Sequence, residues 1–528
     1  MPKRDGALSD TVVRRNLCTT VLLVLMTALV GCALPPLAER PESEAVTPRQ
    51  TVDTRLGRAI APSVGEHPDL SGIIMLNNPY DAFAARALLA EAADTSLDIQ
   101  YYIWRYDITG KILFHTLYRA AERGVRVRLL LDDNGISGLD EPLAALDSHT
   151  GIEVRLFNPF AIRSPKLLGY LTDFSRLNHR MHNKSFTADN QATIVGGRNI
   201  ADEYFGAGHG ALFADLDVLA IGPVVADVSR DFDRYWSSAL AYPVWQLLPE
   251  ADEADLAQLV EEVSQLDDHS AASRYVRAVR RSQFLQRLLD QELAFSWDPV
   301  TMVSDDPAKA QGKGVADGLL SRQLSLALGQ PEKSVTLVSP YFIPTDSGLD
   351  LFRKLEQAGV EVRVLTNSLE ANDVALVHAG YAKYRKPLLK AGVELFEMRK
   401  LAGEDSVEED LQSGLTGSSS SSLHAKTFVV DGKTLFVGSF NFDPRSTHIN
   451  TELGFIIESR RLATVMETRF DEEVPLAAYE LVLDEDGGLQ WIERNGDQII
   501  RYDHDPGTGP LKRMLLFLYS LLPIESLL

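Results

Sequence analysis

The sequence predicts an α/β protein made of two similar halves, each a mixed β-sheet flanked by helices. Three observations predict it. The chain has 528 residues, which is too long for one ordinary hydrophobic core. A strand-helix-strand pattern occurs once in each half of the chain. A short polar constellation follows each pattern, and its two copies lie 242 positions apart.

The composition is that of a soluble globular protein, with 45% hydrophobic and 24% charged residues. The formal net charge is −22, from 52 basic and 74 acidic side chains. Such a balance argues against a surface that gathers nucleic acid by general attraction. No nucleic-acid partner is therefore expected, although a small basic cleft remains compatible with this charge.

The N-terminus is typical of an export signal. Residues 1–31 hold four basic side chains before the apolar run 21–31, which is too short for a comfortable transmembrane span. The run ends in "LVGC", which resembles the lipobox of bacterial lipoproteins and implies cleavage before Cys32 and lipidation of its thiol. Cys18 lies in the discarded segment, so the mature chain can form no internal disulfide. The alternative is an ordinary signal peptide or an uncleaved anchor.

The first half follows a linker. Residues 32–66 are Pro-rich and polar, which predicts a flexible tether with little fixed structure. The first half should cover 67–245. Within it, the hydrophobic periodicity predicts a strand, a helix and a strand at 96–104, 109–124 and 125–133.

The second half repeats this order after a connection. Residues 246–312 are charged and have a helical pattern, so they are expected to connect the halves. The second half should cover 313–505. Its strand, helix and strand are predicted at 334–344, 346–359 and 360–368.

Two further segments have distinctive compositions. Residues 403–422 are acidic and then serine-rich, which predicts a mobile loop beside the second constellation. Residues 506–528 place Lys512 and Arg513 before an apolar stretch that Pro523 interrupts. This stretch is short for a membrane span and suits an interfacial segment. A core helix that seals the domain is an equally good interpretation.

The repeated constellation has the same residue types at the same spacings. If each fixed type occupies roughly one position in twenty, five matches at set spacing occur by chance about once in three million starting points. Two copies are therefore strong evidence of a functional site. The first copy is His182, Lys184, Asp189, Gly196, Gly197 and Asn199, and the second is His424, Lys426, Asp431, Gly438, Ser439 and Asn441.

The spacing suits a phosphate site. A strand places His and Lys, two positions apart, on one face, so both can point into one cavity. The Asp then falls at a hairpin turn. The glycines that follow permit close backbone approach, and an Asn amide can donate to an oxyanion.

This pattern resembles the HxKxxxxD signature, continued by G-S or G-G and Asn, of the phospholipase D superfamily. The resemblance covers about 70 to 528. It implies two α/β halves related by a pseudo-two-fold axis, with their motifs at a shared central cleft, and no need of a metal or cofactor. Gly197 stands where the signature more often has serine, which removes one hydroxyl from the first half.

The resemblance also implies roles. One histidine attacks phosphorus to give a phosphohistidine, and the other protonates the departing alkoxide. We favour His182 as nucleophile and His424 as acid, but the sequence leaves that order open. The groups expected to bind the substrate's phosphate are Lys184, Lys426, Asn199, Asn441, Ser439 and Gly197. Arg445 either binds phosphate or caps its loop.

Each imidazole needs an acid to orient it. Glu452 matches the superfamily's acidic residue after the second motif, and Asp215 is its expected counterpart, with Asp217 as the competing choice. Asp189 and Asp431 complete the catalytic motifs. The turn directs them away from the His-Lys face, which favours a scaffold role for both.

Within the superfamily, "NHRMHNK", "VSDDPAK" and "LLPIESLL" resemble the C-type of bacterial cardiolipin synthases. The resemblance implies transfer of a phosphatidyl group, with phosphatidylethanolamine as donor, to the headgroup hydroxyl of phosphatidylglycerol. Hydrolysis to phosphatidic acid, as in a phospholipase D, is the second interpretation. A nuclease is the third and a non-catalytic phosphate-binding lipoprotein the fourth. With lipid on Cys32, the protein should lie at a membrane surface in the cell envelope and face the periplasm, with inner or outer membrane undecided.

Overall fold

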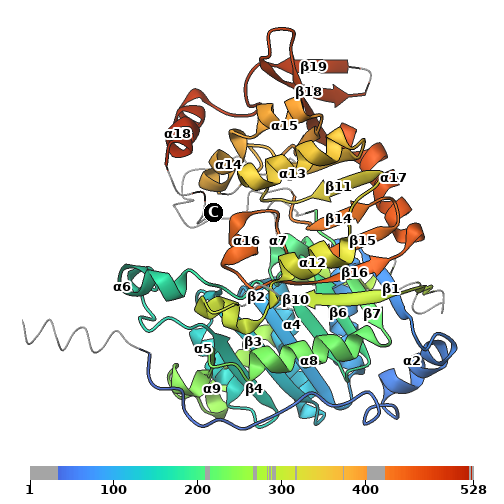
Figure 1. The fold of residues 1–528 in the computed structure, drawn as a ribbon. Helices are drawn as coiled ribbons and strands as arrows, with labels where there is room; N and C mark the ends of the chain where they lie inside the picture. The colour runs from blue at the N-terminus through green and yellow to red at the C-terminus, as the bar shows by residue number, and fades with distance from the viewer. Residues whose placement is uncertain are drawn as a thin grey trace, which may run out of the picture.

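The computed structural model describes residues 34–528 except 208–213, 266–269, 282–283, 285–286, 288–292, 315–317, 373, 401–422, 497, 523–524 and 526–528. Figure 1 shows two sheet-centred bodies, the first half below and the second above, with helices packed around each sheet. The predicted signal peptide, Cys32 and the predicted loop at 403–422 lie outside the described residues.

The first half is built on a nine-stranded mixed sheet with the strand order β8-β4-β3-β2-β5-β6-β7-β1-β9. The strands β2, β3 and β4 run parallel, whereas β5, β6 and β7 form antiparallel pairs. The bounds are β1 Ser71–Leu76, β2 Ser96–Ile103, β3 Arg126–Gly135, β4 Ile152–Phe157, β5 Ser185–Ala188, β6 Ala192–Gly196, β7 Asp217–Ile221, β8 Ala241–Pro243 and β9 Ser296–Asp298.

The second half repeats this arrangement in a ten-stranded sheet with the order β10-β16-β15-β14-β11-β12-β13-β17-β18-β19. Strands β10 to β17 take the places of β1 to β8, and β9, β18 and β19 are additions at sheet edges. The predicted duplication of whole halves is therefore confirmed. The bounds are β10 Val300–Ser304, β11 Ser334–Val338, β12 Glu361–Asn367, β13 Glu394–Met398, β14 Thr427–Val430, β15 Thr434–Gly438, β16 Leu453–Glu458, β17 Ala478–Leu483, β18 Leu489–Asn495 and β19 Gln498–Tyr502.

The helices cover the outer faces of the sheets (Figure 1). The two crossover helices predicted from hydrophobic periodicity are present as α4 and α13. The bounds of the α-helices are α2 Arg55–Glu66, α3 Pro79–Ala92, α4 Ile108–Glu122, α5 Asp140–Asp147, α6 Leu167–Leu177, α7 Asp202–Phe205, α8 Val224–Trp236, α9 Glu253–Ser264, α10 Ser270–Arg280, α12 Leu320–Leu328, α13 Thr345–Gln357, α14 Ala375–Ala382, α15 Arg385–Ala391, α16 Pro444–His448, α17 Arg460–Ala477 and α18 Pro510–Ser520.

The two halves share a hydrophobic core. Val195 and Val218 of the first sheet and Val437 and Phe455 of the second belong to one buried cluster. Strands β6 and β7 contact β15 and β16 across this core. Because burial of apolar surface is the main favourable term in folding, this cluster fixes the halves against each other. The constellations next to these strands are thereby held in place.

The prediction of a flexible tether was wrong for residues 34–66. The Arg40 guanidinium donates to the carbonyls of Ala241 and Ser238, and the Thr51 hydroxyl donates to the Asp189 carbonyl at 2.6 Å. Buried Arg128 donates to the Ser43 carbonyl at 2.8 Å. A Pro-rich segment offers free carbonyls, and arginines on the sheet satisfy them. Composition cannot reveal such partners.

The connection also differs from its prediction. Helices α9 and α10 confirm its helical character, but its last part is strand. β9 pairs with β1 of the first sheet, and β10 pairs with β16 of the second. Pro299 alone separates the two strands. The connection thus ends inside both sheets, well before residue 312.

Candidate active site

Each constellation lies on an extended segment that leads into a hairpin. His182 and Lys184 precede β5, and His424 and Lys426 precede β14. The β5-β6 and β14-β15 pairs are antiparallel, as the sequence predicts. Parallel bridges join Met181 to Thr451 and Leu423 to Ala214, so each motif segment runs beside the opposite half.

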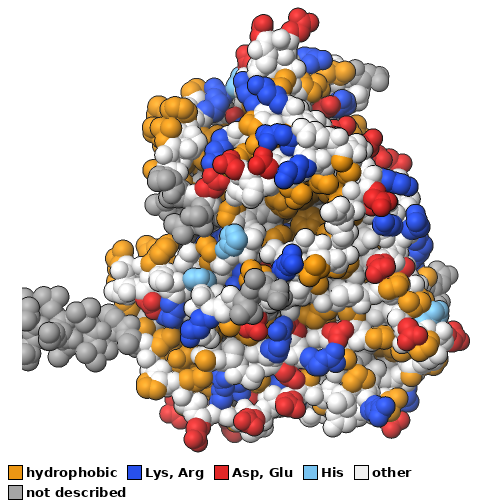
Figure 2. All heavy atoms as spheres, in the orientation of Figure 1, with side chains coloured by type: hydrophobic (Ala, Val, Ile, Leu, Met, Phe, Trp, Pro, Cys, Tyr) orange, Lys and Arg blue, Asp and Glu red, His pale blue; other side chains and the backbone are white. Residues whose placement is uncertain are grey.

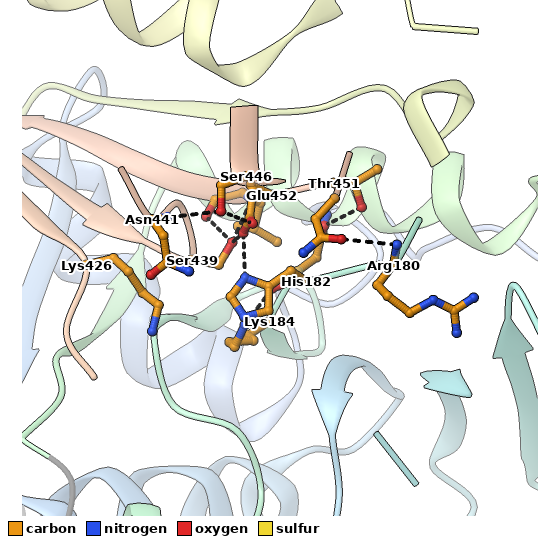
Figure 3. A network of polar contacts seen from close by, with 12 residues as sticks. Arg180, His182, Lys184, Lys426, Ser439, Asn441, Ser446, Thr451 and Glu452 are labelled. Carbon is orange, nitrogen blue, oxygen red and sulfur yellow. Dashed lines mark hydrogen bonds and ion pairs between the residues drawn. The ribbon is translucent and has the colours of Figure 1, made fainter. Parts of the chain in front are cut away.

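The two histidines are oriented by carboxylates from the opposite halves. The Nδ1 atom of His182 lies 2.8 Å from Oε2 of Glu452, and Nδ1 of His424 lies 2.7 Å from Oδ2 of Asp215. The main-chain N–H groups of the same histidines donate to the carbonyls of Thr451 and Ala214, each at 2.9 Å. Figure 3 shows Glu452 directly above the His182 ring. The competing choice, Asp217, is instead paired with Arg86 at 2.8 Å.

Two tyrosines that the sequence analysis did not single out complete the ring contacts. Tyr102 packs on His182 with ring centroids 5.0 Å apart and an interplanar angle of 75°. Tyr204 packs on His424 at 5.0 Å and 80°. With Nδ1 held by a carboxylate, these contacts fix each ring plane and leave Nε2 as the reactive nitrogen. In the sequence, only the two adjacent tyrosines of "QYYIW" could have drawn attention to Tyr102.

The two lysines lie against the histidines of their own motifs. Lys184 Nζ donates to the His182 carbonyl at 2.5 Å. Lys426 Nζ lies 2.9 Å from Nδ1 and 3.1 Å from Nε2 of His424. Burial lowers the pKa of Lys184 to about 7, and the nearby charge of Lys426 acts in the same direction. The site therefore concentrates positive charge that an anionic group would relieve.

Both imidazoles are neutral in this environment. Burial, followed by the charges of Lys184 and Lys426, lowers the pKa of His182 well below its ordinary value. Burial and Lys426 lower the pKa of His424 to about 3, against an opposing effect of Asp215. A neutral ring whose Nδ1–H faces a carboxylate carries its lone pair on Nε2, which is the form that can attack phosphorus.

The two carboxyl groups differ in their electrostatics. Burial raises the pKa of Glu452 to about 7, although Lys184 and the hydroxyls of Ser439 and Ser446 oppose this. Burial also acts to raise the pKa of Asp215, but the charge and hydrogen bond of His424 and the charge of Lys426 outweigh it and leave the pKa below its ordinary value. Asp215 is therefore ionised at neutral pH, whereas Glu452 titrates there.

The predicted phosphate contacts at the two motif ends are unequal. The Ser439 hydroxyl donates to Glu452 Oε2 at 2.5 Å and so supports the carboxylate. At Gly197, a Cβ atom would lie 2.1 Å from Asp215 Oδ1, so the missing side chain makes room for the Asp215 carboxylate. In both halves the residue at this position, Gly197 or Ser439, thus helps to place the carboxyl group that orients a histidine. A direct role of Ser439 or Gly197 in binding phosphate stays a prediction.

The two asparagines also differ. Asn199 accepts from the Ile103 N–H at 3.1 Å and donates to the Tyr204 hydroxyl at 3.0 Å, so its amide holds the loop behind Tyr204. Asn441 is buried, and its Oδ1 has no hydrogen-bond partner among the described residues. Figure 3 shows Asn441 beside Ser439 and Lys426. An unpartnered Oδ1 can accept a hydrogen bond from a hydroxyl or ammonium group of a ligand, whereas a phosphate oxygen would need the N–H of the Asn441 amide.

The motif aspartates bind the backbone, in keeping with the scaffold role that their turn positions favour. Asp189 accepts hydrogen bonds from the N–H groups of residues 94, 95 and 96 at 2.8 to 3.0 Å. Asp431 accepts from those of residues 332, 333 and 334 at 2.7 to 3.2 Å. Both occupy positive-φ turn positions, with φ of 51° and 54°. They tie each hairpin to the start of the neighbouring antiparallel strand, β2 in the first half and β11 in the second.

A buried ion pair from the connection supports Glu452. Asp305 Oδ2 accepts the Glu452 main-chain N–H and the Lys309 ammonium, each at 2.9 Å. Lys309 also donates to the carbonyl of Ser446 at 2.8 Å, and the Ser446 hydroxyl donates to Glu452 Oε1 at 2.8 Å. The phrase "VSDDPAK" contains both residues of the pair, although sequence reasoning gave them no role.

The described residues contain no cluster of three or more His, Cys, Asp or Glu side chains arranged to hold a metal ion. The chemistry that this arrangement can perform is nucleophilic attack by one imidazole, with the second as acid and base and two ammonium groups beside them.

Comparison with known proteins agrees with this chemistry. The family described as "Cardiolipin synthase, PLD-like domain" matches residues 86–236 and 324–474, one match in each half. Cardiolipin synthase C of Escherichia coli (strain K12) is 49% identical over 474 residues, which cover 90% of this chain and 100% of that protein. An uncharacterized protein of Helicobacter pylori (strain ATCC 700392 / 26695) is 32% identical over 412 residues, or 78% of this chain and 80% of that one.

A solved structure shares the fold. The phosphatidylserine synthase of Haemophilus influenzae Rd KW20 superposes with a TM-score of 0.54 at 13% sequence identity. The match covers 89% of this chain and 100% of that one. At this identity the similarity concerns the fold alone.

Proposed function

The chain belongs to the family of phospholipase D-like proteins that includes the cardiolipin synthases, and from this premise we propose that it is a phosphatidyl transferase that makes cardiolipin from two phospholipids. The observation that carries the proposal is the pair of crossed carboxylate-histidine contacts, at 2.8 and 2.7 Å, which orient two rings that both lie in the field of Lys184 and Lys426.

The reaction has two displacement steps. In the first, Nε2 of one histidine attacks the phosphorus of the donor lipid, and a P–N bond replaces the P–O bond to the departing headgroup. The second histidine donates a proton to that alkoxide. In the second step the same histidine takes the proton of the acceptor's hydroxyl, whose oxygen attacks phosphorus and breaks the P–N bond. Lys184 and Lys426 stabilise the charge on the non-bridging oxygens.

The electrostatics support His182 as nucleophile and His424 as acid. Ionised Asp215 favours a proton on His424, as an acid requires. Burial and the charges of Lys184 and Lys426 keep the His182 ring neutral, so with its Nδ1–H on the Glu452 carboxylate its Nε2 retains a free lone pair. An anionic phosphate beside the ammonium groups would offset the repulsion that holds the pKa of His424 low, and so would allow that ring to be protonated once substrate binds.

The family resemblance supports phosphatidylethanolamine as donor and phosphatidylglycerol as acceptor. Water in place of the acceptor would give phosphatidic acid, which is the alternative phospholipase D activity. A nuclease is disfavoured by the net charge of −22. The non-catalytic alternative is disfavoured because both histidines retain an orienting carboxylate.

The test is incubation of the purified full chain with vesicles of phosphatidylethanolamine and phosphatidylglycerol, followed by lipid mass spectrometry. Cardiolipin should accumulate, with release of ethanolamine, and His182→Ala should form no product. Accumulation of phosphatidic acid without cardiolipin would overturn transfer and leave hydrolysis. Turnover by His182→Ala would overturn the site assignment.

We also propose that Cys32 carries a lipid anchor and that the enzyme lies in the cell envelope, facing the periplasm. The sequence "LVGC" and the preceding apolar run support this. The mass of the mature N-terminal peptide tests it, since lipidation adds acyl chains that a Cys32→Ser variant lacks. Fractionation of inner and outer membranes then decides between the two. An unmodified Cys32 in the purified chain would contradict the anchor.

A further inference from the structure

The exposed hydrophobic side chains of the described chain are concentrated in two places. Of nineteen large apolar side chains that are exposed, eleven belong to α6, α18 or the two leucines after α18. On α6, Leu171 is 81% and Phe174 49% exposed. On α18, Leu511 is 64% and Phe517 63% exposed. Exposed apolar patches of this kind mark interaction surfaces in soluble proteins.

The two helices come from different halves but lie on one side of the molecule. Figure 1 shows α6 at the left edge of the first half and α18 at the left edge of the second. Figure 2 shows two hydrophobic patches at the corresponding places, one above the other. The first described residues of the chain also begin on this side in Figure 1. A planar partner could therefore contact both helices at once.

Helix α6 is connected to the catalytic centre by side-chain contacts. The Tyr170 hydroxyl on α6 donates to Asn134 Oδ1 at 2.9 Å. The Asn134 amide donates to the Tyr102 hydroxyl at 3.3 Å, and Tyr102 packs on His182. The exposed face of α6 is thus three contacts away from the first catalytic histidine.

Helix α18 is connected to the segment of the other histidine by a different set of contacts. Leu516 of α18 packs in a small cluster with Leu369 and Ala379. Two residues before Leu369, the Asn367 amide accepts from and donates to the main chain of Leu423, at 3.1 and 3.0 Å. Leu423 directly precedes His424. Asn134 is next to last in β3 and Asn367 is the last residue of β12, so both sets of contacts pass the carboxyl ends of equivalent strands.

We propose that α6 and α18 together form a docking surface for a phospholipid bilayer, on either side of the route by which lipids reach the histidines. This inference rests on the proposed lipid-transfer function. No helix among the described residues has the length and hydropathy to cross a membrane. Short helices with one apolar face insert in the plane of the headgroups, and there they would bring the cleft to the depth of the phosphodiester bonds.

The test separates docking from chemistry. The full chain is assayed on vesicles and on dihexanoyl phospholipids below their micellar concentration, which are dissolved singly and need no docking. The double variants Leu171→Ser/Phe174→Ser and Leu511→Ser/Phe517→Ser should each lose about tenfold in rate on vesicles and keep the wild-type rate on soluble lipids. Controls are Leu326→Ser and Leu476→Ser, which are 66% and 56% exposed elsewhere and should keep both rates.

A direct contact measurement accompanies the assay. Tryptophan at Leu171→Trp or Phe517→Trp should be quenched by vesicles with brominated acyl chains, whereas Leu476→Trp should not. Equal losses on both substrates, equal losses in the controls, or no quenching would overturn the docking surface. A change from dimer to monomer in light scattering, with vesicle activity intact, would show a subunit interface instead. If the wild type converts neither substrate, the proposed function is wrong. The quenching measurement still shows whether α6 and α18 insert into the bilayer.

Discussion

His182 Nδ1 lies 2.8 Å from Glu452 Oε2, a carboxylate 270 positions further along the chain and in the other half of the fold. Asp215 and His424 repeat this contact in the opposite sense, over 209 positions. Each half therefore supplies one ring and orients the other. The two half-sites form a single unit, so a substitution of either carboxylate should disturb the orientation of the histidine in the opposite half.

The order of the two histidines can be tested with a donor whose leaving group is p-nitrophenolate, which departs without a proton. His424→Ala should then release about one p-nitrophenol per protein in a burst and stall, because the base for the second step is missing. His182→Ala should give no burst, because the nucleophile is absent. The measurement is rapid-mixing absorbance. A burst in His182→Ala and none in His424→Ala would reverse the assignment.

The two orienting acids should affect stability with opposite sign. Burial raises the pKa of Glu452 in the folded protein to about 7. Between pH about 4 and about 7 the unfolded chain therefore releases this proton while the folded chain retains it, and the free energy of unfolding falls as the pH rises. Glu452→Gln avoids this loss. Relative to the wild type, its free energy of unfolding should increase by about 2 kcal/mol between pH 5 and pH 8.

Asp215→Asn is the matched comparison. The pKa of Asp215 lies below its ordinary value, so its ionised form stabilises the fold at every pH above the unfolded value of about 4. The Asn variant should be less stable than the wild type by a constant amount from pH 5 to pH 8. Denaturant unfolding at several pH values measures both variants. A pH-independent difference for Glu452→Gln would contradict the raised pKa.

Lys184 should limit activity on the alkaline side. Its pKa of about 7 means that the free enzyme loses this ammonium group as pH rises through neutrality, and with it a contact to phosphate. The kcat/KM of the wild type should fall above that pH. Lys184→Arg keeps its charge there, so its residual activity should lack the alkaline decline. A decline of the same shape in Lys184→Arg would assign it to another group.

Restoring the more usual serine at position 197 should harm the enzyme. A Cβ atom there would approach Asp215 Oδ1 to 2.1 Å, so Gly197→Ser must displace the acid that orients His424. We expect kcat to fall by at least about tenfold, as for loss of a positioned group in general acid-base catalysis. The reciprocal change, Ser439→Gly, creates no clash and removes one donor to Glu452, so it should cost less. Kinetics of both variants check this, and a harmless Gly197→Ser would show that Asp215 can move.

The ion pair in the connection should matter for Glu452. Asp305→Ala leaves the Glu452 N–H and the buried Lys309 ammonium without their acceptor, and breaking such a pair costs about 3 kcal/mol or more. Asp306→Ala changes the adjacent, half-buried carboxylate, which caps the following 3-10 helix but does not contact Glu452, and serves as control. If Asp305 positions Glu452, Asp305→Ala should also shift the pH at which kcat/KM falls on the acid side. Asp306→Ala should leave that pH unchanged. An unchanged pH in Asp305→Ala would make Asp305 purely structural.

Much of the fold followed from periodicity and duplication. The 242-residue spacing predicted both hairpins and the pairing of the motifs, since β-strand alternation fixes which side chains share a face. The crossing of the carboxylates could not be predicted, because spacing within one half carries no information about contacts between halves. The tether was mispredicted because the buried acceptors and donors of the sheet, such as Arg128, are invisible in a local composition. The exposure of the apolar face of α6 was not predicted, because a short apolar helix is ordinarily buried.

The crossed contacts also bear on when the enzyme becomes active during its synthesis. A growing chain that ends before residue 424 lacks the second ring altogether, and one that ends before residue 452 still lacks the carboxylate that contacts His182. The first half alone therefore lacks both the second imidazole and the acid that orients the first. A complete site therefore forms only after nearly the whole polypeptide has been made and its two halves have packed against each other.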